Sequence, residues 1–91
     1  MSRKLGLVGG LGPASTLDYY RGINDGYRAR IGGDGNPPMI IDSLNLAEAY
    51  ALVSDRRWVE FTDLFVQSLR ALAAGGAEFA AIAANRTIDP P

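Results

Sequence analysis

The chain has 91 residues, enough for one domain and not for two. Nine basic and ten acidic residues give a net charge of −1 without any Lys/Arg cluster, which argues against nucleic acid and anionic membranes as partners. The sequence contains no Cys and no His, so disulfides, thiol nucleophiles and the commonest metal ligands are excluded and we expect no metal site. The apolar runs are too short for a signal sequence or a membrane span, which predicts a cytoplasmic protein.

The stretch from Lys4 to Ser15 predicts a strand, a glycine loop and the start of a helix. Gly9, Gly10 and Gly12 allow a positive φ and a close approach of the backbone to a ligand. Pro13 suits the first turn of a helix, where its missing N–H costs nothing. The unpaired amides at that helix start would favour an anion such as a carboxylate or phosphate, so we expect this loop to face a ligand.

A long helix is predicted from Pro13 to about Ile31, because apolar residues recur there at steps of three or four. The expected buried face consists of Leu17, Tyr20, Ile23, Tyr27 and Ile31. The run from Gly32 to Pro38 ends the helix, since glycine favours the C-cap and proline cannot continue it.

A second strand, Met39–Ile41, is followed by the polar residues Asp42, Ser43 and Asn45. A short helix is expected over Leu46–Val53. Polar residues in such positions form turns and helix caps more often than they bind ligands.

The next helix is expected to begin at Ser54 or Asp55 as N-cap and to end at Ala73–Gly76. Its apolar stripe is predicted to be core and consists of Trp58, Phe61, Leu64, Phe65, Leu69 and Leu72. The third strand, Phe79–Ala83, contains only small or apolar residues, as expected of a strand covered on both faces.

Strands alternating with helices predict an α/β fold with three layers: a short parallel sheet and helices on both faces. Ligands of such sheets bind beyond the carboxyl ends of the strands. Those ends are followed here by Gly10–Gly12, by Ser43 and Asn45, and by Asn85. Three polar loops are therefore expected to converge on one edge of the sheet.

The glycine loop has two other interpretations. Gly10–Ser15 matches a dinucleotide-binding fingerprint except that Ser15 replaces the third glycine, and Asp42 would then contact the ribose. Against this, Pro13 removes an amide that a pyrophosphate would use. The loop would otherwise be a simple strand-to-helix turn without a ligand.

Several linked motifs resemble the aspartate/glutamate racemase family, whose members interconvert amino-acid enantiomers without pyridoxal phosphate. They are Gly6 to Thr16, running on into Tyr19–Asn24, then Ile40–Ser43, the Trp58 helix, Ala73–Phe79 and Ala81–Asn85. Together they cover residues 4 to 87. The resemblance implies that the chain, residues 1–91, is the N-terminal lobe of a two-lobe enzyme that needs no cofactor.

In that family the third strand runs into a Cys-Asn-Thr motif, and the second lobe supplies another thiol. Ala84 occupies the first thiol position here, Asn85 matches the Asn, and Arg86 precedes Thr87. The resemblance assigns substrate binding to Gly10, Leu11, Gly12, Ser43, Asn85 and Thr87. Because the motif is lost after Asn85 and two prolines follow, we expect residues 86–91 to be a non-native tail.

Racemisation needs an acid/base group on each side of the α-carbon and hydrogen-bond donors around the substrate carboxylate. This half-site has donors and no evident base. The resemblance therefore implies a racemase lobe for amino acids such as aspartate or glutamate, and we expect the lobe to be inactive alone. We also expect the isolated chain to be marginally folded or to self-associate as a homo-oligomer. The alternatives are a nucleotide- or carboxylate-binding half-domain and a lobe that docks on a full-length relative.

Overall fold

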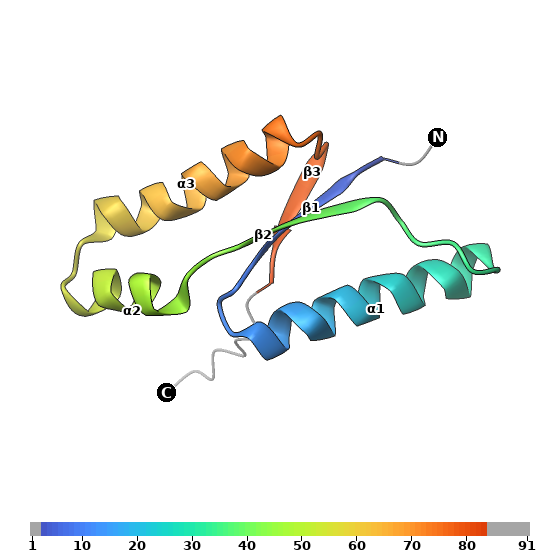
Figure 1. Cartoon of the computed structure of the whole chain (residues 1–91), viewed down its shortest axis with the longest axis horizontal. Coiled ribbons are helices and arrows are strands. Elements are labelled where there is room, and N and C mark those ends of the chain that lie inside the picture. Colours follow the sequence, from blue (N-terminus) through green and yellow to red (C-terminus); the bar gives the residue numbers. More distant parts are fainter. Residues whose placement is uncertain (1–2, 84–91) are drawn as a thin grey trace.

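The computed structural model describes residues 3–83, which form a three-stranded parallel sheet with strand order β2-β1-β3. The elements in chain order are β1 (Leu5–Gly9), α1 (Pro13–Ile31), β2 (Met39–Ser43), α2 (Leu46–Ser54), α3 (Trp58–Ala74) and β3 (Phe79–Ile82). Helix α1 lies on one side of the sheet, and α2 and α3 lie on the other (Figure 1). The predicted three-layer α/β architecture is confirmed.

Two glycines of β1 bring the helices close to the sheet. A Cβ on Gly6 would lie 3.1 Å from Leu72 Cδ1 of α3, whereas a Cβ on Gly9 would lie 2.8 Å from Thr16 Cγ2 of α1. Residues three apart in a strand point to opposite faces, so α1 and α3 each pack against the backbone of the central strand. The small core is centred there, with Leu7, Val8 and Leu72 fully buried.

The predicted buried face of α1 is largely wrong. Leu17 is 63% exposed and Ile31 is 68% exposed, whereas the polar residues Ser15 and Asn24 are buried. A 19-residue helix is about 28 Å long and a five-residue strand about 17 Å, so α1 extends well past the sheet that it covers. Ile31 is the last residue of α1, at the end of the helix that is farthest from the β1–α1 loop.

No helix within residues 3–83 is both long and apolar enough to cross a membrane.

Helix α3 begins later than expected. Asp55 is the C-cap of α2, which continues to Ser54, and the N-cap of α3 is Arg57. The Arg57 guanidinium bonds the Glu60 carboxylate at 2.8 Å, and this hydrogen bond lowers the pKa of Glu60. Both side chains are exposed, so the pair supports the first turn of the helix only weakly.

Only part of the predicted α3 stripe is core. Leu72 is fully buried, but Trp58 and Leu69 are exposed, and Phe61 stacks edge-on against Phe65 in a partly exposed cluster.

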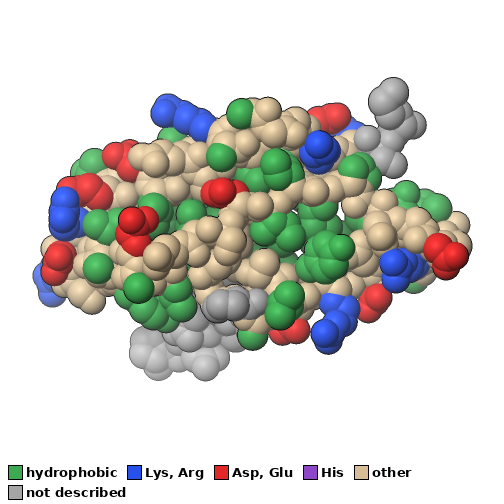
Figure 2. Space-filling model, viewed as in Figure 1, with side chains coloured by type: hydrophobic (Ala, Val, Ile, Leu, Met, Phe, Trp, Pro, Cys, Tyr) green, Lys and Arg blue, Asp and Glu red, His purple; other side chains and the backbone are tan. Residues whose placement is uncertain are grey.

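The expectation that the third strand is covered on both faces is also wrong. Every residue of β3 is exposed, and Phe79 is 52% exposed. Within residues 3–83, β3 is an edge strand, paired with β1 on one side and with no strand on the other. Figure 2 shows apolar side chains on the surface among dispersed acidic and basic ones.

Candidate functional site

The carboxyl ends of the three strands lie level at one edge of the sheet. Gly9 is in register with Ser43, and the amide of Leu44 donates to Gly9 O at 2.8 Å. On the other side of β1, the amide of Ala83 donates to Val8 O at 2.8 Å. The structure thus brings the Gly10–Gly12 loop next to Ser43 and to the end of β3, as the strand pattern predicted.

Gly10 fixes how closely the two loops approach. Its φ of 85° lies in the left-handed region, and a Cβ there would collide with the backbone of Leu44 and sit 2.7 Å from Ser43 Oγ. No side chain fits between the loops. The Ser43 hydroxyl is consequently held beside the backbone of the glycine loop.

Thr16 organises the site and was not singled out from the sequence. Its Oγ1 accepts a hydrogen bond from the amide of Gly10 at 3.0 Å, and its side chain fills the space beside Gly9. The sequence signal was a hydroxyl residue one turn into a helix that follows a glycine loop. Such a residue can reach back to the loop that precedes the helix.

The start of α1 offers fewer free donors than expected. The N-cap is Gly12, Pro13 has no N–H, and the amides of Ser15 and Thr16 both donate to Gly12 O, at 3.0 and 3.3 Å. Within residues 3–83, the amides of Leu11, Gly12 and Ala14 make no hydrogen bond. Three amides and one hydroxyl suit the two oxygens of a carboxylate better than the many oxygens of a pyrophosphate.

Asn45 has a structural role. It is the N-cap of α2, and its Oδ1 accepts from the amide of Glu48 at 3.2 Å, which confirms the interpretation as a helix cap. Three further residues of the predicted site, Ala84, Asn85 and Thr87, lie outside the described residues. So does the predicted tail, 86–91. Among residues 3–83 no group of three His, Cys, Asp or Glu side chains is placed to hold a metal.

A parallel α/β sheet with its ligand-facing loops at the strand ends is the fold of many enzymes that act on small molecules. Comparison with known proteins identifies the family within this class of protein. The sequence profile of the family described as Asp/Glu/Hydantoin racemase matches residues 8–88. The chain belongs to this racemase family.

The fold agrees with a solved member of that class. A crystal structure of a Yersinia pestis protein assigned as an Asp/Glu racemase superposes with a TM-score of 0.86 at 31% sequence identity. The match covers 89% of this chain and 35% of that chain, so the chain spans about a third of the length of this relative.

Proposed function

We propose that this chain is the lobe of a cofactor-independent amino-acid racemase that holds the substrate carboxylate. The observation that supports the proposal is the junction of the glycine loop and Ser43 at the strand ends of a chain from the racemase family. Carboxylates of aspartate or glutamate are the ligands that we expect there. Residues 1–91 then form one lobe of a two-lobe site.

The proposed roles follow from the donors. The amides of Leu11 and Gly12 and the hydroxyl of Ser43 would bind the α-carboxylate, and Asn85 and Thr87 would complete the set. These hydrogen bonds stabilise the negative charge that develops when the α-proton leaves. The chain contains no Cys or His to take that proton, and Ala84 stands at the family's thiol position. We therefore propose that the isolated chain binds and does not racemise.

The second candidate is a carboxylate-binding module without catalysis. The amides of Leu11, Gly12 and Ala14, which make no hydrogen bond within residues 3–83, favour a carboxylate over a nucleotide as its ligand. Titration calorimetry with aspartate, glutamate and NAD separates carboxylate binding from nucleotide binding. Heat with either amino acid and none with NAD supports a carboxylate site. Binding of NAD in preference to both amino acids would support the dinucleotide interpretation.

We expect the purified chain to leave the α-proton of L-aspartate in place. Proton NMR in D₂O measures the loss of the α-proton signal over time, with a buffer blank as control. Because no thiol or imidazole is present to abstract the proton, the rate should equal that of the blank. Exchange well above the blank would mean that another group, such as a carboxylate, acts as the base.

We also expect the chain to self-associate. The exposed apolar side chains and the free edge of β3 would both be removed from water by contact with a second copy. The melting temperature should rise with protein concentration, and sedimentation equilibrium should detect species larger than 9.7 kDa. A monomer that melts cooperatively at one temperature, over a roughly hundredfold range of concentration, would contradict this expectation.

A further inference from the structure

The side chain of Thr16 packs against the central strand and also reaches the glycine loop. Its Cγ2 and Oγ1 lie 2.8 and 2.9 Å from the position that a Cβ on Gly9 would occupy, so both branches of the side chain contact the backbone of β1. Its Oγ1 also accepts a hydrogen bond from the amide of Gly10 at 3.0 Å. The packing depends on the shape of the side chain, whereas the contact with Gly10 depends on the hydroxyl. Substitution can therefore separate the two.

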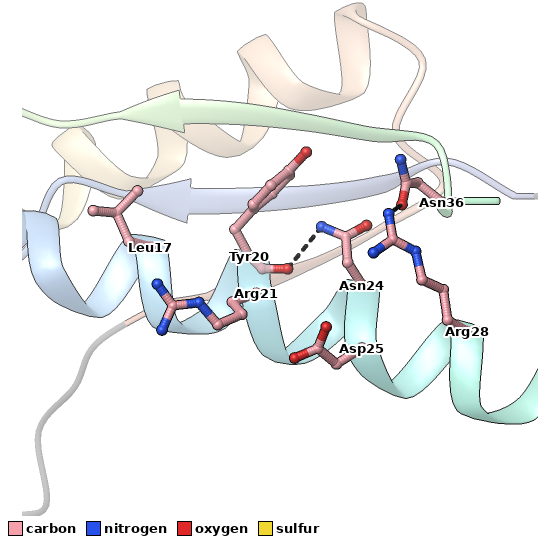
Figure 3. Close-up of a pocket in the computed structure, with 7 residues that line it drawn as sticks. All are labelled: Leu17, Tyr20, Arg21, Asn24, Asp25, Arg28 and Asn36. Atoms are coloured by element: carbon pink, nitrogen blue, oxygen red, sulfur yellow. Dashed lines mark hydrogen bonds between the residues drawn. The ribbon is translucent and has the colours of Figure 1, made fainter. Parts of the chain in front are cut away.

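Thr16 lies on the side of α1 that faces the sheet. Tyr20 and Asn24 follow it at steps of four residues, and Figure 3 shows both side chains directed from α1 toward the strands. A hollow of about 290 Å³ borders these later turns of the helix, and Thr16 does not line it. The contact between Thr16 and β1 is therefore direct, and it lies close to the start of α1.

The peptide group that joins Gly9 to Gly10 is held from both sides. Its carbonyl oxygen, Gly9 O, accepts from the amide of Leu44 at 2.8 Å, and its N–H donates to Thr16 Oγ1. Within residues 3–83 this N–H has no other acceptor. A peptide group between two glycines rotates easily, because neither residue has a Cβ that restricts its dihedral angles. The hydroxyl of Thr16 consequently fixes one side of a peptide group that is otherwise free to turn.

We propose that Thr16 is a positioning residue of the carboxylate site, an inference that rests on the proposed function of the glycine loop. The peptide group that Thr16 holds directly precedes those that carry the amides of Leu11 and Gly12. Its orientation therefore sets the direction in which these two amides point. It also keeps the loop beside Ser43, whose Oγ lies 2.7 Å from the position of a Cβ on Gly10. Without the hydroxyl the donors adopt several directions, and a ligand binds more weakly because it has to order them.

The test compares two substitutions in the full 91-residue chain. Thr16→Val keeps the branched shape and removes the hydroxyl, whereas Thr16→Ser keeps the hydroxyl and removes the methyl group. Both should lower the melting temperature, because valine leaves the Gly10 amide without an acceptor and serine removes packing against β1. Titration calorimetry with L-aspartate should show binding at least about tenfold weaker for Thr16→Val. The affinity of Thr16→Ser should stay within about twofold of the parent.

Two further substitutions serve as controls. Thr62→Val makes the same chemical change at an exposed position of α3 and should bind L-aspartate as the parent does. All variants are also made in a Gly22→Ala chain, in which alanine replaces an exposed glycine of α1 that has no atom within 4 Å of the added Cβ. This background favours the helix and keeps Thr16→Val folded for the measurement.

The outcomes distinguish this inference from the proposed function. If the parent binds L-aspartate and Thr16→Val binds it as tightly, the inference is wrong and the carboxylate site stands. The inference is also wrong if Thr16→Ser loses affinity in step with its stability, since the role of Thr16 is then only structural. If the parent binds neither aspartate nor glutamate, the proposed function fails, and the role of Thr16 in binding fails with it.

Hydrogen exchange of the Gly10 amide tests the same contact without a ligand. Measured relative to the amide of Leu7 on β1, this exchange should become at least about tenfold faster in Thr16→Val and stay unchanged in Thr16→Ser. An unchanged rate in Thr16→Val would show that the hydroxyl does not hold the peptide group between Gly9 and Gly10, and would overturn the inference.

Discussion

Gly10→Ala is expected to remove more than half of the free energy of unfolding of the chain. Alanine at a φ of 85° costs roughly 1–2 kcal/mol, and its Cβ collides with the backbone of Leu44, which cannot move without breaking the hydrogen bond from Leu44 N to Gly9 O. We expect a total loss of at least about 3 kcal/mol in the free energy of unfolding, measured by urea titration followed by circular dichroism. A small domain has only about 5 kcal/mol to lose.

The matched control is Gly22→Ala, the same chemical change at an exposed position inside α1 with no atom within 4 Å of the added Cβ. It should raise stability by about 0.5–1 kcal/mol, because alanine favours the helix more than glycine does. Combining the two substitutions keeps enough folded protein for the measurement. A Gly10→Ala chain as stable as the parent would show that the two loops do not meet as closely as described.

Leu72→Ala is expected to cost about 3 kcal/mol. Leu72 is 1% exposed and contacts the position of Gly6 on β1, so its removal leaves a cavity between α3 and the central strand. Leu69→Ala removes the same atoms from a residue of the same helix that is 40% exposed. Its cost should be about 1 kcal/mol or less. Thermal and urea denaturation of both variants measure the difference, and equal losses would contradict the burial of α3 through Leu72.

The order of the strands and helices could be predicted because the sequence marks the start and end of most of them with typical residues. The glycine loop with Pro13 at the first turn placed the start of α1, and Gly32 placed its end, where φ is 83°. The boundary between α2 and α3 was missed because Ser54 and Asp55 are good N-cap residues by type. In the structure α2 continues one residue further and Arg57 takes the N-cap.

Burial was predicted less well than secondary structure, because periodicity shows that a face is apolar and not that something covers it. Leu17 and Ile31 are at the expected helical spacing and remain exposed. Ile31 lies where α1 extends past the sheet, whereas Leu17 is close to the sheet and no described residue covers it. Phe79 is apolar and also exposed, because it lies in an edge strand.

The meeting of Gly10 with Ser43 followed from topology, since parallel strands end together. The contribution of Thr16 did not follow, because it depends on how closely α1 approaches Gly9.

The central position of β1 has a consequence for hydrogen exchange. In the described part of the chain, β1 is paired along both edges, whereas β2 and β3 are each paired along one. Because β1 lies between two strands, its amides should exchange with solvent more slowly than those of β2 and β3, which also open by local fraying. The glycine loop begins at the end of this most protected strand. Its geometry depends on the contacts of Gly10 with Leu44 and Thr16, so it should be maintained while β1, β2 and α1 stay packed, even while β3 opens and closes.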